Sequence, residues 1–231
     1  MAKIKLVFFD MEGVIFDTGV KEFGKNTAAS LWTILVKALG PAAVEDDQRG
    51  KDIWNDGKFK NYMEWVEYAA RAHQKHGLKM DLFYQVIHSV PYMKGALEVF
   101  EELRKRGIKT VIISGGFKNQ ANRAIRDLKI DHVFAACEYF FDENSGLLSH
   151  WNIIPCDYEG KVDFMGLMMR EYKLKPEECA FVGDGVNDKF LAKEVGLSIA
   201  FNGRKELQDV CTHSINQPED QKDLREILKF L

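Results

Sequence analysis

Apolar runs that stop abruptly at a polar residue are the feature of this sequence that most restricts its fold. Candidate strands at 4–10, 109–114 and 179–184 end on Asp10, Ser114 and Asp184. A further candidate lies at 197–201, and weaker ones lie at 131–136 and 211–215. Short apolar runs without polar alternation are typical of strands that are buried on both faces.

Helical periodicity separates these runs. The expected helices lie near 93–106, 118–128, 160–172, 186–195 and 219–230. Strands that alternate with helices predict an α/β fold with a doubly wound parallel sheet. We expect a core domain formed by 1–15 and 91–231.

The segment 16–90 differs from the rest because it contains no convincing strand. Its apolar residues Tyr62, Trp65, Val66, Ala69 and Ala70 recur at the spacing of one helix face. The segment is too long for a plain crossover connection, so it predicts an inserted helical cap. Five aromatic residues are expected to pack inside that cap: Trp32, Trp54, Tyr62, Trp65 and Tyr68.

Composition narrows the class of partner. The net charge of −3, from 32 basic and 35 acidic residues, gives no basic surface for nucleic acid or an anionic membrane. No apolar run approaches the ~20 residues of a membrane helix, and the start of the sequence does not resemble a signal peptide. The four cysteines form no CxxC pair and are expected to be reduced. We expect a cytoplasmic protein with a small-molecule partner and no nucleic acid or membrane partner; the sequence does not indicate its oligomeric state.

The polar ends of the strands predict a common site. In an open parallel sheet, ligands bind beyond the carboxyl ends of the strands, where Asp10, Ser114 and Asp184 would converge. The turns SGGF at 114–117 and GDGVND at 183–188 let the backbone approach an anion closely. The helix expected after Gly116 would offer free N–H groups to a phosphate. Carboxylates and a phosphate need a mediating cation, and Asp10 and Asp184 suit Mg²⁺.

Four motifs carry a family resemblance. DMEGV at 10–14, SGG at 114–116, Lys161 and GDGVND at 183–188 resemble, in order and spacing, the motifs of the haloacid dehalogenase superfamily. The resemblance is to its phosphoserine phosphatase-like branch, which has a helical cap. It covers nearly the whole chain, including the hairpin-like segment at 142–151 and the 22-residue step from Lys161 to Gly183.

The resemblance implies an activity and a set of roles. The activity is Mg²⁺-dependent hydrolysis of a small phosphorylated metabolite through an aspartyl-phosphate on Asp10, with Glu12 transferring protons. The implied metal ligands are the Asp10 and Asp184 side chains and the Glu12 main-chain carbonyl, with Asp188 supporting them from behind. The implied phosphate-binding and substrate-binding residues are Ser114, Gly115, Lys161 and Asn187.

Two departures from the family bear on chemistry and substrate. Glu12 stands where the family usually has aspartate, although a phosphotransferase-type member of the branch carries the similar pattern DLEGV. Phosphoserine phosphatases recognise the amino acid with a glutamate nine positions after the nucleophile and with a cap arginine. Here those positions hold Gly19 and Ala69, with Glu22 and Arg71 as the nearest substitutes. The resemblance therefore leaves the substrate unidentified.

Two alternatives remain open from the sequence. The phosphoryl group could pass to a small alcohol, which would make the protein a phosphotransferase. The chain could instead be a catalytically weak phosphate-binding module. Retention of all the charged motif residues argues against the second alternative.

Overall fold

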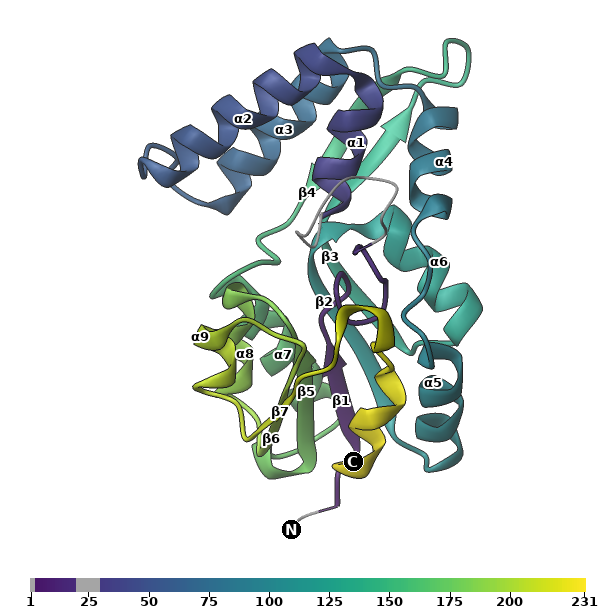
Figure 1. Cartoon of the computed structure of the whole chain (residues 1–231), viewed down its shortest axis with the longest axis vertical. Helices are drawn as coiled ribbons and strands as arrows, with labels where there is room; N and C mark the ends of the chain where they lie inside the picture. Colours follow the sequence, from purple (N-terminus) through teal and green to yellow (C-terminus); the bar gives the residue numbers. More distant parts are fainter. Residues whose placement is uncertain (1–2, 20–29) are drawn as a thin grey trace.

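A seven-stranded sheet forms the centre of the computed structural model, which describes residues 3–19 and 30–231 (Figure 1). Its strand order is β4-β3-β2-β1-β5-β6-β7, and every adjacent pair is parallel except β3–β4. The strands are β1 (Leu6–Phe9), β2 (Lys109–Phe117), β3 (His132–Phe141), β4 (Leu148–Ile153), β5 (Cys179–Gly183), β6 (Leu197–Phe201) and β7 (His213–Ile215). The prediction of an α/β doubly wound fold is confirmed.

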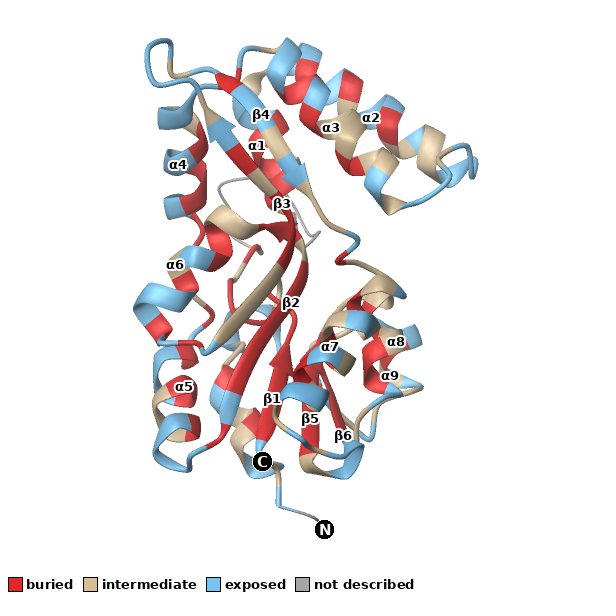
Figure 2. Ribbon diagram, turned by 180° about the vertical axis from the view of Figure 1, so that it is seen from behind, coloured by how far each residue is buried: buried red, intermediate tan, exposed pale blue. Residues whose placement is uncertain are grey.

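Some of the helices pack on the sheet, and others form the segment between β1 and β2. They are α1 (Leu31–Leu39), α2 (Pro41–Asn55), α3 (Tyr62–Lys75), α4 (Met80–Ser89), α5 (Ala96–Lys105), α6 (Lys118–Leu128), α7 (Gly160–Glu171), α8 (Lys189–Ala192) and α9 (Lys205–Gln208). Figure 2 shows the central strands buried and the exposed residues concentrated on the outer faces of the helices. The expectation of a helical segment before β2 agrees with α1–α4.

Two expected helices differ from the structure. The segment near 186–195 is a 3₁₀ turn, Val186–Asp188, followed by the short α8, because Asp188 folds back to accept N–H groups at the turn. The segment near 219–230 consists of two 3₁₀ turns, Glu219–Gln221 and Leu224–Lys229. Asp223 between them is extended, with φ −148°, and its side chain accepts from the Arg225 N–H, so a continuous helix cannot form.

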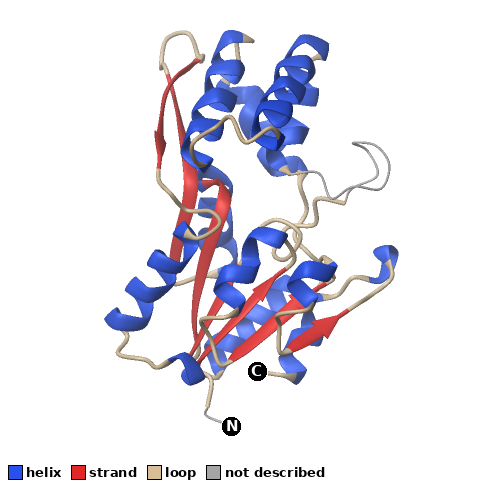
Figure 3. Ribbon diagram, turned by 90° about the vertical axis from the view of Figure 1, so that its left-hand side faces the viewer, coloured by secondary structure: helices blue, strands red, loops and turns tan. Residues whose placement is uncertain are grey.

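Strand β4 was not among the strands predicted from apolar runs, although the family resemblance implied a hairpin-like segment at 142–151, and β3 is longer than expected. The sequence of β4 is LSHWNI, and half of its residues are exposed because it is an edge strand, so the apolar signal is weak. Figure 3 shows the β3–β4 hairpin extending beyond the rest of the sheet, beside the helices. The Gln74 side chain of α3 donates to the carbonyls of Leu148 and Ser149 at 3.2 and 3.0 Å.

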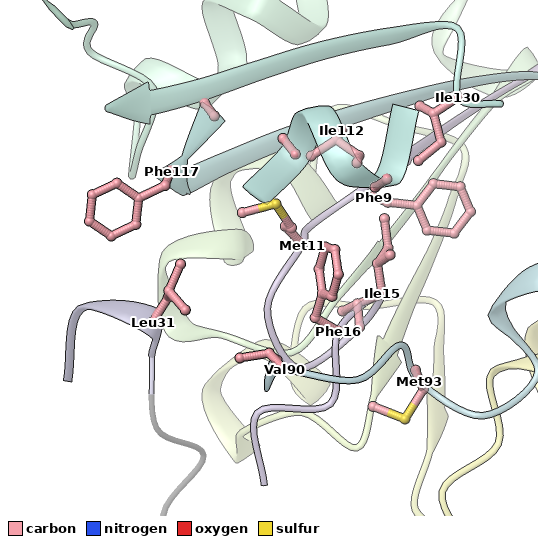
Figure 4. Packing of buried hydrophobic residues seen from close by; sticks show 14 of the residues in the cluster. Phe9, Met11, Ile15, Phe16, Leu31, Val90, Met93, Ile112, Phe117 and Ile130 are labelled. Carbon is pink, nitrogen blue, oxygen red and sulfur yellow. The ribbon is translucent and has the colours of Figure 1, made fainter. Parts of the chain in front are cut away.

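One hydrophobic cluster runs from the sheet into α1, α3 and α4. Figure 4 shows Phe9, Met11 and Phe16, in and after β1, close to Ile112 of β2. Trp32 of α1 packs on Phe117 at the end of β2, with 4.0 Å between ring centroids. The helices are thus anchored on the sheet, while the division into a core of 1–15 and 91–231 and a cap of 16–90 stays a prediction.

Two further expectations concern membranes and thiols. Among the described residues, no helix combines the length and the apolar character needed to cross a membrane. Each of the four cysteines, Cys137, Cys156, Cys179 and Cys211, is a free thiol. The unpaired thiols agree with the expectation of reduced cysteines.

Asp46 of α2 connects this helix to the end of α3 through hydrogen bonds and ion pairs. Its carboxylate accepts from Lys75 and His76 at 2.7 Å each, and Arg49 lies 3.4 Å away. The hydrogen bonds from Lys75 and His76 lower the pKa of Asp46 from 3.8 to about 2. Because the pKa is lowered on folding, the carboxylate stabilises the fold above about pH 4 and loses that effect as the pH falls toward 2.

We therefore expect Asp46→Asn to reduce the free energy of unfolding by about 2 kcal/mol at pH 7. The difference from the parent protein should shrink between pH 4 and pH 2, because the parent carboxylate then becomes neutral. Urea unfolding at several pH values measures both effects. Asp56→Asn is the matched control because its pair with Lys58 is exposed, and it should change stability by less than about 0.5 kcal/mol. Equal losses from the two variants would contradict this role for Asp46.

Candidate active site

The predicted convergence at the carboxyl ends of the strands is present in the structure. Asp10 follows β1, Ser114 lies in β2 and Asp184 follows β5. All three line one cavity of about 310 Å³, together with Glu12 and Asn187. The Asp10 backbone N–H donates to the Val182 carbonyl at 2.9 Å, which fixes the end of β1 against β5.

Lys161 of α7 lies fully buried beneath this cavity. Its Nζ donates to Asp188 Oδ1 at 2.7 Å and to Asp10 Oδ1 at 2.9 Å. Burial alone would lower the pKa of Lys161, but the nearby carboxylates, Asp10 first, raise it well above its ordinary value. The lysine is therefore a permanent cation shared among buried acids.

Asp188 is the most enclosed of these acids. One oxygen accepts from Lys161, and the other accepts from the N–H groups of Asp184 and Gly185 at 3.1 and 3.0 Å. Both oxygens are thus engaged by donors. Asp188 does not itself line the cavity, and its supporting role stays a prediction.

The remaining carboxylate oxygens fit a divalent cation. Oxygens of Asp10, Asp184 and Asp188 lie within 4.8 Å of one another. Asp10 Oδ2 and both Asp184 oxygens accept no hydrogen bond from any described residue. Burial, and next the charge of Asp10, raises the pKa of Asp184 well above its ordinary value, and burial raises the pKa of Asp10 to about 7. A hard cation bound by oxygen would relieve this repulsion.

Glu12 contacts the helices rather than the other acids. Its Oε1 accepts from the Leu31 N–H at 3.1 Å, at the start of α1. Burial raises the pKa of Glu12 to about 8, although the Leu31 N–H opposes the rise. The carboxyl can therefore carry a proton near neutral pH, as a proton donor requires.

The SGG turn is shaped by close contacts. Ser114 Oγ accepts from the Gly116 N–H at 3.1 Å, and the Gly115 carbonyl accepts from the Tyr62 hydroxyl at 2.6 Å. A Cβ on Gly115 would lie 2.4 Å from Asp157 Oδ2, so only glycine fits there. The helix expected after this turn is α6, which begins at Lys118 and has no side-chain cap at its start, whereas the Gly116 N–H itself is already bound to Ser114.

Sequence reasoning missed several residues of the cavity. Asp157 accepts from Asn187 Nδ2 at 2.6 Å, and its only sequence signal was its position four residues before Lys161. Arg204 lies after β6, so the rule on carboxyl ends of strands could have found it. Three aromatic residues expected only to pack also line the cavity: Trp32, Tyr62 and Trp65.

Arg71, the described one of the two suggested substitutes for substrate recognition, does not line the cavity. Arg71 pairs with Glu67 at 2.6 Å, its side chain is 69% exposed, and it is absent from the cavity lining. Ala69 packs against the hydrophobic cluster. Gly19 lies near the side chains of Glu219 and Asp17, and Glu22 falls outside the described residues.

Comparison with known proteins identifies the family. A model for haloacid dehalogenase-like hydrolases matches residues 4–196. The phosphoserine phosphatase of Lactococcus lactis is 32% identical over 155 residues, which are 67% of this chain and 69% of that protein. The phosphoserine phosphatase of Archaeoglobus fulgidus is 28% identical over 231 residues, 98% of this chain and 60% of that protein.

Solved structures share the fold. A phospho-aspartyl intermediate analogue of phosphoserine phosphatase matches with a TM-score of 0.78 and 23% identity, over the whole length of both chains. A substrate-bound phosphoserine phosphatase complex matches with a TM-score of 0.75 and 23% identity, again over both whole chains. The family match, the relatives and the shared fold confirm the resemblance seen in the four motifs: the chain belongs to the haloacid dehalogenase-like hydrolase family, within its phosphoserine phosphatase-like branch.

Proposed function

We propose that this protein hydrolyses a small-molecule phosphomonoester through an aspartyl-phosphate on Asp10, with Mg²⁺ as cofactor. The observation that carries the proposal is the environment of Asp10. One of its oxygens is held by the buried Lys161, and the other accepts no hydrogen bond from a described residue and belongs to a side chain that lines the cavity. The phosphoserine phosphatase relatives support the same reaction.

The first half of the reaction forms a bond between Asp10 Oδ2 and phosphorus. The carboxylate donates the electron pair, and the bond from phosphorus to the ester oxygen breaks, so the leaving alcohol departs as an alkoxide that needs a proton. Lys161 holds Oδ1 at 2.9 Å and so orients the attacking oxygen. In the second half, water attacks phosphorus and restores the Asp10 carboxylate.

Glu12 supplies and then recovers the proton. In its protonated form it donates to the leaving alkoxide, and the resulting carboxylate accepts a proton from the attacking water. The bond from the Leu31 N–H fixes one Glu12 oxygen, which leaves the other for proton transfer. The longer side chain of glutamate, compared with aspartate, is what reaches α1.

The negatively charged phosphoryl oxygens must be stabilised by hydrogen-bond donors and by positive charge. Ser114, Gly115, Lys161 and Asn187 would contact them. Mg²⁺, held by Asp10, Asp184 and the Glu12 main-chain carbonyl, would neutralise charge between the carboxylates and the phosphoryl group. Asp188 would keep the Asp184 turn in place through its bonds to two backbone N–H groups.

We also propose a domain division, a class of substrate and a location in the cell. Residues 16–90 form a cap over a core of 1–15 and 91–231, and the substrate is a small phosphorylated metabolite that enters the cavity between them. The free thiols support a cytoplasmic location.

A phosphate-release assay with Mg²⁺ and a panel of phosphorylated metabolites tests this function. Asp10→Asn should lower kcat by at least about 10³-fold, because the nucleophile is lost. Asp131→Asn is the matched control: this carboxylate pairs with Lys109 at 2.6 Å at the opposite end of the strands, and activity should stay within about threefold. An Asp10→Asn variant within tenfold of the parent would contradict the mechanism.

The same assay separates water from alcohol as the acceptor. If added glycerol or a small amino alcohol becomes phosphorylated at a rate that exceeds phosphate release, the protein is a phosphotransferase. If inorganic phosphate remains the dominant product, it is a phosphatase, which is the outcome that we expect.

Glu12→Gln tests the proton transfer. With alkyl phosphates, turnover should fall by about 10²–10⁴-fold, because the leaving alkoxide receives no proton. With an activated aryl phosphate the first step needs little help, so phosphoenzyme should accumulate in rapid-quench samples while its hydrolysis is slow. Normal turnover of alkyl phosphates, without accumulation of phosphoenzyme, would show that another group transfers the proton.

A further inference from the structure

Asp157 lies between the cavity of the site and an adjoining groove. It lines the 310 Å³ cavity of the site and also an adjoining groove of about 450 Å³ that is bordered by Trp54, Tyr62 and Tyr158. We propose that Asp157 determines specificity by binding an ammonium group on the leaving alcohol, so that the substrate is the phosphate ester of an amino alcohol. The inference rests on the proposed phosphatase function.

The two oxygens of Asp157 have different environments. Oδ1 accepts from Asn187 Nδ2 at 2.6 Å and from the Tyr158 N–H at 2.9 Å, and it lies 3.7 Å from Lys161 Nζ. Oδ2 accepts no hydrogen bond from any described residue. It is not sealed inside the protein, because in the described part of the chain only the Gln120 amide atoms are buried without a partner. Oδ2 can therefore accept a hydrogen bond from a ligand, whereas Oδ1 already accepts two from the protein.

The position of Oδ2 places this acceptor near the phosphate. A Cβ on Gly115 would lie 2.4 Å from Oδ2, so the oxygen sits directly over the residue that follows Ser114. A donor bound to Oδ2 would thus lie only a few atoms from phosphorus. The separation suits an amine on a short alcohol whose phosphate occupies the SGG turn.

Charge favours an ammonium over a neutral donor. Lys161 forms its longest ion pair with Asp157, at 3.7 Å, compared with 2.9 Å to Asp10 and 2.7 Å to Asp188. A side-chain carboxylate that is 8% exposed and shares its cation with two other acids is costly, and a second cation, from the substrate, would offset that cost. The rings of Tyr62, Trp54 and Tyr158 lie 5.6–6.2 Å apart at their centroids on the groove side, and aromatic faces also attract cations.

Two phosphonates that contain no ester bond provide a direct test. 3-Aminopropylphosphonate has the shape of an amino alcohol phosphate, and n-butylphosphonate replaces its ammonium with a methyl group. Titration calorimetry with Mg²⁺ present should give a Kd for the amine at least tenfold lower than for the butyl compound. In Asp157→Asn this ratio should fall to about one, because the amide carries no charge. The ratio cancels any common loss that comes from disturbing Asn187 or Lys161.

Glu159→Gln is the matched control. This exposed acid borders the same groove but does not line the 310 Å³ cavity, so its removal should leave the ratio as in the parent. Asp157→Ser is the second variant if the asparagine variant does not fold, since the hydroxyl can still accept from Asn187. A parent ratio near one, or a tenfold ratio that survives in Asp157→Asn or Asp157→Ser, would overturn the proposal.

These ratios do not depend on turnover. Failure of the phosphatase function would appear as the absence of Mg²⁺-dependent phosphate release in the metabolite assay, whatever the phosphonates do. Failure of the Asp157 inference would appear, in an enzyme that still releases phosphate, as a parent ratio near one or as an amine preference that survives in the Asp157 variants.

Discussion

The buried ammonium of Lys161 is the interaction on which the site depends. It lies between the carboxylates of Asp10 and Asp188, which come from opposite ends of the chain and would otherwise repel one another. Removing a charged lysine from water is costly, and only close, well-directed carboxylates compensate that cost. The end of β1, the start of α7 and the turn after β5 are therefore held in one arrangement, which leaves one Asp10 oxygen open to the cavity.

The helices before β2 complete this site rather than merely covering it. The Leu31 N–H at the start of α1 binds the carboxyl of Glu12, and the Tyr62 hydroxyl of α3 binds the carbonyl of Gly115. Trp32 packs against Phe117 and so fixes α1 on the end of the strand that carries Ser114. A displacement of α1 or α3 from the sheet would therefore break the contact to Glu12 or the contact to the SGG turn.

The sequence predicted the sheet and the three strand-end residues because buried parallel strands have a strong local signal. Lys161 has no such signal, and only the family motifs identified it. Asp157 and Arg204 were missed because a lone acid or base is usually a surface residue, and their positions depend on tertiary packing. Strand β4 was missed because an exposed edge strand lacks an apolar run, and the helix near 219–230 was wrong because the Asp223 side chain competes for backbone N–H groups.

In the proposed reaction, Asp10 itself carries the phosphoryl group. Quenching the enzyme during turnover and reducing it with borohydride converts an aspartyl-phosphate into homoserine, which peptide mass spectrometry locates. We expect homoserine at position 10, only when substrate and Mg²⁺ are both present. Turnover at the normal rate with an unmodified Asp10 peptide, or homoserine at another acid such as Asp184 or Asp157, would contradict it.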